Sequence, residues 1–257
     1  MGAARMIGTI RSEQIKLRTV LMHWVLAVIA VGFPLLVTLL NAGIRADDGD
    51  FDARSLVEVL SGTSVVGILL IGVIAAASVT GEFGFNTIRP TLAATPRRAR
   101  VVTAKAIVVV VLALALQGLV LLVGWFVGAG LAEGRGATID LGTVDGGIEA
   151  LLGSLVFALM MALVGLGLGL IVRSTPAAVA AIILWPLLVE NLLGGLLSVI
   201  FDGTNIASWM PFRAGLNLLA VDSIGDGPSR MVGGIYFGAF ALVLLGLGTW
   251  LLHRRDA

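Results

Sequence analysis

The sequence predicts an all-α polytopic membrane protein with six transmembrane helices. Hydrophobic residues make up 58% of its 257 residues and charged residues 13%, whereas soluble domains average about 45–50% and 25%. Six apolar runs reach roughly the 20 residues that cross about 30 Å of hydrocarbon. They cover residues 20–41, 59–80, 106–128, 149–172, 177–201 and 231–252. Such long, continuous runs form helices rather than barrel strands, so we expect residues 1–257 to be a single transmembrane domain.

The segment before the first span predicts a helix of its own. Residues 4–19 mix apolar side chains such as Met6, Ile10 and Leu17 with charged ones such as Arg11 and Lys16. A short amphipathic helix in the membrane interface is the simplest account, and a solvated basic tail is the alternative. The apolar core that follows is too long for a typical signal peptide and lacks a clean cleavage site, so we expect the first span to be retained.

The distribution of Lys and Arg predicts the orientation. With the amino terminus inside, twelve of the 17 basic residues are cytoplasmic, namely Arg5, Arg11, Lys16, Arg18, Arg89, Arg97, Arg98, Arg100, Lys105, Arg173, Arg254 and Arg255. The other side holds five, namely Arg45, Arg54, Arg135, Arg213 and Arg230. Cytoplasmic loops carry the excess of basic residues, so both termini are expected in the cytoplasm. The composition, rich in Arg, Ala and Gly, is typical of a GC-rich bacterial genome. We therefore expect the protein in a bacterial plasma membrane.

The loop between the second and third spans is the most informative segment. It runs from Thr80 to Lys105, where Gly81 and Gly84 permit a helix break and Thr87 or Thr95 could cap a short helix. Its basic residues Arg97, Arg98, Arg100 and Lys105 suit anionic headgroups or an acidic protein groove. A basic loop that only sets topology is the alternative.

This loop resembles the signature of ABC-2-type transporter permeases, most closely the bacterial branch that exports antibiotics and bacteriocins. The resemblance lies in Glu82-Phe83, Thr87-Ile88-Arg89, Leu92, Pro96-Arg97-Arg98 and Lys105. Asn86 departs from the pattern, because the family usually has glycine before the threonine. The resemblance implies six spans, both termini inside, an amphipathic helix before the first span and a coupling helix between the second and third.

The resemblance also implies partners. Family members work as two permease copies, here a homodimer, with two separate cytoplasmic ATPases that bind ATP and Mg²⁺ and contact the coupling helix. The residues expected to couple to the ATPase are Glu82, Phe83, Phe85, Thr87, Arg89, Leu92, Pro96, Arg97 and Arg98. Glu82 is expected to meet a basic residue of the partner or the amino end of the short helix, and Arg97 and Arg98 the lipid headgroups. The chain has no G-x-x-x-x-G-K-[ST] motif, so it is not expected to be an enzyme or to hold a cofactor.

One acid, Glu190, lies inside a predicted span. An ionisable group there costs at least about 2.5–3.5 kcal/mol. Glu190 precedes Asn191 and follows Trp185-Pro186 in the sequence. Pro186 and the Gly194-Gly195 pair are expected to bend or break the helix. These four residues, Trp185, Pro186, Glu190 and Asn191, are therefore candidates for the transport pathway. A structural carboxyl group hydrogen-bonded to a neighbouring helix is an equal alternative.

The remaining features limit the function. Residues 202–230 are expected to form short interfacial or re-entrant helices on the outside, with a simple loop as the alternative. A net charge of +1, no cysteine and two distant histidines disfavour nucleic-acid binding, disulfides and metal sites. We expect a permease that exports a drug, an antimicrobial peptide or a lipid, with multidrug or antibiotic resistance as one outcome. The alternatives are an ion-gradient-driven carrier using Glu190, an ABC exporter of a cation such as Na⁺, and a purely structural subunit.

Overall fold

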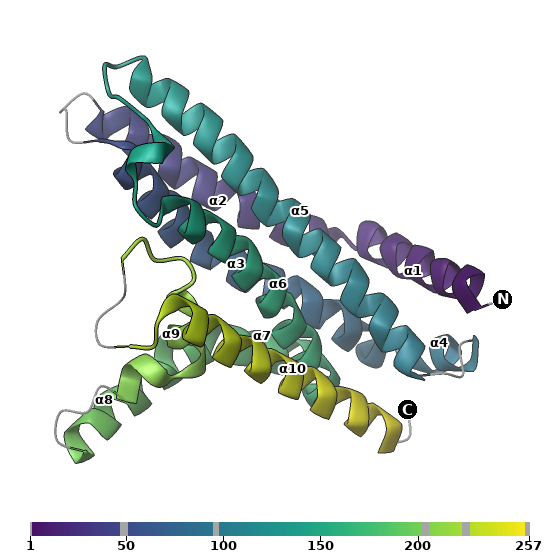
Figure 1. Cartoon of the computed structure of the whole chain (residues 1–257). Helices are drawn as coiled ribbons and strands as arrows, with labels where there is room; N and C mark the ends of the chain where they lie inside the picture. Colours follow the sequence, from purple (N-terminus) through teal and green to yellow (C-terminus); the bar gives the residue numbers. More distant parts are fainter. Residues whose placement is uncertain (1, 47–50, 95–97, 202–205, 223–226, 255–257) are drawn as a thin grey trace.

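The computed structural model describes residues 2–46, 51–94, 98–201, 206–222 and 227–254. Six helical segments in this part of the chain are long and apolar enough to cross a membrane, which confirms the predicted fold class. They are α2 (Leu21–Arg45), α3 (Ala53–Gly84), α5 (Arg98–Glu133), α6 (Gly147–Val172), the segment from α7 (Thr175–Leu184) through α8 (Glu190–Ile200), and α10 (Arg230–Arg254). Figure 1 shows that both termini lie at the same end of the bundle, which we name the terminal end.

Two of the spanning helices are much longer than the apolar runs that predicted them. Helix α3 has 32 residues and α5 has 36, so at about 1.5 Å per residue they exceed 45 Å, well over the 30 Å of hydrocarbon. The apolar run marks only the part in lipid, whereas the helices continue into a polar region. At the terminal end these extensions carry Glu82, Arg98 and Lys105.

The short elements agree with two further expectations. Helix α1 (Gly2–Thr19) precedes the first span and packs against α5. Helix α4 (Ile88–Ala94) lies between the second and third spans. Three shorter helical elements follow: the 3₁₀ helices η1 (Leu141–Thr143) and η3 (Ile206–Trp209), and the helix α9 (Pro211–Leu216). The last two confirm short helices in the segment after the fifth span.

Helix α3 is the centre of the bundle. About 67% of its spanning window is buried, compared with 22–28% for α2, α5 and α10. It packs most extensively on α6, and a Cβ atom on Gly165 would lie 2.1 Å from the carbonyl oxygen of Gly72. Only glycine allows this separation of the two backbones. Inside the bundle, the Gln117 amide donates hydrogen bonds to Ser64 and Ser154 on these two helices, both at 3.0 Å.

The turn after α3 explains how the chain reaches α4. Asn86 has a φ of +54°, in the left-handed region. Asparagine is among the few non-glycine residues that adopt this conformation readily, so it can replace the glycine that the family usually has there. The backbone N–H of Thr91 donates to the Thr87 carbonyl, which places Thr87 at the cap position of α4. Thr95, the other predicted cap, lies outside the described residues.

Candidate functional site

A cluster of four charged side chains joins the helices at the terminal end; we name it the ion cluster. Lys105 on α5 donates to Glu13 on α1 at 2.5 Å and to Glu82 on α3 at 2.8 Å. Lys16 on α1 donates to the same two carboxylates, at 2.7 and 2.8 Å. These are the only two lysines in the sequence. Two positive and two negative charges thus balance at the junction of three helices.

Three of the four side chains of the ion cluster are buried, whereas that of Lys16 is 38% exposed. Glu13, Glu82 and Lys105 are only 4%, 7% and 2% exposed. The Lys105 ammonium also donates to the Ser78 carbonyl, and that of Lys16 reaches the Thr91 hydroxyl of α4 at 3.4 Å. Burial alone would lower the pKa of Lys16, but its hydrogen bonds to both carboxylates outweigh this, and its pKa lies above the ordinary value of 10.5.

The structure corrects the position expected for Glu82. Its carboxylate points into its own chain and pairs with two lysines, so it is available neither to a basic residue of a partner nor to the amino end of α4. Phe83 is also engaged internally, because the Arg173 guanidinium lies 4.7 Å from the centre of its ring. The loop motif in the sequence could not show that Glu82 faces inward, because its partners are 66 and 23 residues away.

Three other predicted coupling residues form an exposed surface, which we name the coupling surface. It consists of Phe85, Thr87 and Arg89, between the end of α3 and the first turn of α4. Phe85 is 84% exposed. Of the remaining coupling residues, Leu92 lies in α4, and nothing is described of its side chain; Pro96 and Arg97 lie outside the described residues.

Arg98 links two helices at the terminal end. Its guanidinium donates to the carbonyl oxygens of Leu252 and His253 in the last turns of α10. These bonds fasten the start of α5 to the end of α10, and the expected contact of Arg98 with lipid headgroups stays a prediction. Carbonyl groups at a helix end lack partners within the helix and attract a cation.

The second candidate region surrounds Glu190. Helix α7 ends at Leu184 and a π-helical turn, η2 (Trp185–Val189), precedes α8. This turn contains Pro186, which removes a backbone donor, so the regular α-helical bonding is interrupted at the predicted place although residues 175–200 form one continuous helical segment. The break is less evident at Gly194, which continues in α8 and packs tightly on Ala207 of η3.

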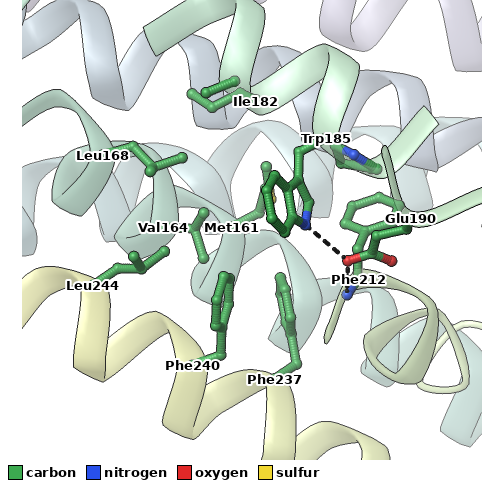
Figure 2. A pocket seen from close by; sticks show the side chains of 12 residues that line it. Met161, Val164, Leu168, Ile182, Trp185, Glu190, Phe212, Phe237, Phe240 and Leu244 are labelled. Carbon is green, nitrogen blue, oxygen red and sulfur yellow. Dashed lines mark hydrogen bonds between the residues drawn. The ribbon is translucent and has the colours of Figure 1, made fainter. Parts of the chain in front are cut away.

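Glu190 is fully buried and accepts three hydrogen bonds. Its Oε1 accepts from the Trp185 indole at 3.2 Å and the Phe212 backbone N–H at 2.9 Å (Figure 2). Its Oε2 accepts from the Arg213 N–H at 3.0 Å. The carboxyl group therefore binds the first N–H groups of α9, which have no partners within that helix. Asn191 accepts from the Arg213 side chain. These contacts hold α9 against the fifth span, as the structural alternative for Glu190 expects.

A cavity of about 230 Å³ lies beside Glu190, between α6, α7, α9 and α10. Figure 2 shows Phe237, Phe240 and Leu244 of α10 pointing into it from one side and Trp185 from another. The ring of Phe157 contacts those of Phe212 and Phe237, with ring centroids 5.3 and 4.9 Å apart. Trp185, Pro186 and Glu190 line the cavity, whereas the fourth pathway candidate, Asn191, does not.

Sequence reasoning missed the roles of Glu13, Lys16 and Lys105. Lys105 was predicted as part of a basic loop and of the loop motif, and Lys16 as part of an amphipathic segment, neither with a buried partner. A usable signal existed, because arginine supplies every other basic residue of the chain. Lysine concentrates its charge on a compact ammonium with three donors, which suits a buried point between two carboxylates. Glu13 was likewise the single acid in a basic segment.

Comparison with known proteins agrees with this architecture. The model of a family described as ABC-2 family transporter protein matches residues 9–189, more than half of the chain. The matched range contains the whole ion cluster, the coupling surface and the π-helical turn. No curated protein matches the chain. The family model does not separate the antibiotic- and bacteriocin-exporting branch from the others. With six membrane-spanning helices and this match, the chain belongs to the ABC-2 family of transporter permeases.

Proposed function

We propose that this chain is the permease subunit of an ATP-driven exporter, moving a hydrophobic or amphipathic substrate out across the bacterial plasma membrane. The family implies pairing with an ABC ATPase subunit, which we place on the cytoplasmic, terminal end. A drug, an antimicrobial peptide and a lipid are the substrate classes, and a second copy of the permease completes the membrane part. The single observation that carries the proposal is an exposed coupling surface on a rigidly anchored turn.

Exposure of Phe85 supports a partner at this surface. Burying a phenylalanine side chain is worth about 1.5–3 kcal/mol, and in this chain 84% of that side chain stays exposed. Phe85 follows the last residue of α3, five residues beyond the apolar run 59–80, so we expect it to lie outside the hydrocarbon. A groove on a cytoplasmic ATPase would bury the ring, with Thr87 and Arg89 at the edge of the contact.

Anchoring of the turn supports a role in transmission. The ion cluster fixes the end of α3 to α1 and α5, and the Lys16–Thr91 contact adds α4. Arg173, which follows α6, stacks on Phe83. A force applied at Phe85 therefore reaches several helices at once, because buried ion pairs resist separation. A flexible tether would absorb the same force.

The contacts of Glu190 favour an exporter of apolar substrate over the two cation-based alternatives. A carrier or a Na⁺ exporter using Glu190 needs a carboxylate that can take up and release a cation. Here both carboxylate oxygens accept backbone N–H groups of α9. Binding a cation would compete with these bonds and release the segment that they hold.

The test is co-purification and transport with candidate ABC ATPases from the genome of origin. Phe85→Asp places a charge in the proposed contact and is expected to abolish co-purification, transport or both, while the permease still enters the membrane. Phe85→Leu keeps the apolar contact and is expected to retain both. Gln14→Asp adds the same charge at an exposed position of α1 and serves as the matched control. Normal assembly and transport by Phe85→Asp would reduce the loop to a topological tether.

A further inference from the structure

We propose that the cavity between α6, α7, α9 and α10 binds a hydrocarbon chain of a bilayer lipid, which enters sideways from the membrane. The proposal concerns binding alone, so it is separate from the transport function proposed above. Its basis is the chemistry of the cavity wall, the depth of the opening and the size of the space.

The chemistry of the wall selects an apolar ligand. The lining combines aliphatic side chains such as Met161 and Leu244 with the rings of Phe212, Phe237 and Phe240. The two polar side chains in the lining satisfy each other, because the Trp185 indole N–H donates to Glu190. Glu190 accepts its other hydrogen bonds from α9. A polar ligand would lose its hydrogen bonds to water without replacement, which disfavours its binding.

The depth of the opening selects a chain rather than a headgroup. The opening of the cavity is marked by the lining residues that are not buried. Among them are the exposed Trp185 and the partly exposed Ala181 and Phe240. Phe240 lies ten residues from Arg230 and fourteen from Arg254 along α10. At about 1.5 Å per residue it is roughly 15–21 Å from either charged end, near the middle of the hydrocarbon. A phosphate or sugar cannot occupy this depth, but the end of an acyl chain can.

The size of the space suits part of a chain. The cavity measures about 230 Å³, whereas an apolar cavity of about 150 Å³ in another protein stays free of water and takes up benzene. An empty cavity of this size forgoes the dispersion contacts that its rings and methyl groups would make. A terminal stretch of acyl chain restores them, and in a bilayer such chains are the surrounding solvent.

The test is photolabelling of the full chain in phosphatidylcholine vesicles. A trace of phosphatidylcholine carries a diazirine at the end of one acyl chain, and labelled residues are identified by mass spectrometry after irradiation. The inner wall includes Met161, Ile182 and Phe237, which are 2%, 1% and 1% exposed, so lipid on the outer surface does not reach them. Leu187 and Leu192, which are 56% and 64% exposed, report ordinary surface lipid.

Two matched substitutions on α7 make the result decisive. Ala181→Phe fills the cavity from its lining, whereas Ala180→Phe adds the same ring at an exposed position outside it. We expect inner-wall labels in the wild type and in A180F, and their loss in A181F, with surface labels unchanged. Leu168→Phe, on α6, is expected to reproduce the loss and replaces A181F should that variant fail to fold. Labels confined to surface residues in the wild type, or inner-wall labels that persist in both filled variants, would overturn the proposal.

Discussion

The ion cluster gives the sharpest test of how the terminal end is held together. Replacing Lys105 by Met keeps much of the side chain's length and removes its charge. Two carboxylates, each under 10% exposed, then share only Lys16. Removing one partner from a buried ion pair costs about 3–5 kcal/mol, because the other charge stays buried without compensation. Since α1, α3 and α5 all meet at Lys105, we expect the loss to reach the stability of the whole bundle.

A second substitution separates charge from packing. In the double variant Lys105→Met, Glu13→Gln, one positive and one negative charge remain, so the uncompensated carboxylate is gone. We expect the double variant to recover a large part of the lost stability, although each change removes hydrogen bonds. Gln14→Asp, on the exposed face of α1, is the control for a change in charge at the same end.

The assay is thermal unfolding of purified protein, followed by size-exclusion chromatography after heating. A loss of 3–5 kcal/mol corresponds to a fall in Tm of roughly 10 °C for a chain of this size. A Tm for Lys105→Met within about 1 °C of wild type would contradict the buried cluster, since less than ~1 kcal/mol would then be lost. So would a double variant whose loss relative to wild type equals the sum of the losses of Lys105→Met and Glu13→Gln alone, because independent sites add and coupled sites do not.

Two further predictions concern carboxylates that bind helix N-termini. Glu190→Gln places an amide N–H₂ where one carboxylate oxygen now accepts a hydrogen bond, so it should lower the free energy of unfolding by about 1.5–3 kcal/mol. Glu190→Leu should lower it by more. A Tm equal to that of wild type for both variants would contradict the bonds to Phe212 and Arg213. Asp52 caps α3 by accepting from the Ser55 N–H, which holds the pKa of its carboxyl below the ordinary 3.8. This stabilisation is therefore present above pH 3.8 and lost as the pH falls through the lower value of the folded state. Asp52→Ala should lower the unfolding free energy by about 0.5–2 kcal/mol at neutral pH, and a Tm difference from wild type that did not shrink in acid would contradict it.

The six spans were predictable because an apolar run is a local property. Any helix in lipid must be apolar over about 20 residues, and the sequence displays this without knowledge of packing. The helix ends were not predictable in the same way. Residues 106–128 were predicted for a helix that extends from Arg98 to Glu133. Both extensions have partners that are distant in sequence: Lys105 and Arg98 bind α1 and α10, and Ala132 belongs to a buried cluster with Ala42 of α2.

The candidate sites were predictable in place but not in detail. The loop motif located the turn correctly, and Phe85 is as exposed as an ATPase contact requires. The same motif gave Glu82 an outward role that the structure contradicts, because the direction of a side chain at a helix end depends on distant partners. At Glu190 the sequence left a functional and a structural reading equally open. The three hydrogen bonds support the structural one, and a part in transport stays a prediction.

The two candidate sites are connected through the start of α7. Thr80, on α3 two residues before Glu82, shares a hydrogen bond of 2.7 Å with Thr175, the first residue of α7. Helix α7 leads to the π-helical turn that forms one wall of the cavity, and Glu190 follows at once and holds α9. If the end of α3 moves, we therefore expect the Thr80–Thr175 hydrogen bond to pass that movement to the first turn of α7, where the fifth span begins. A π-helical turn replaces the i→i+4 bonding of an α-helix by i→i+5 bonding and is frequent at functional sites, so we expect that span to yield there. In a coupled exporter, loss of transport in Phe85→Asp would follow from failure of the first step on this route, with the cavity and its acyl chain left intact.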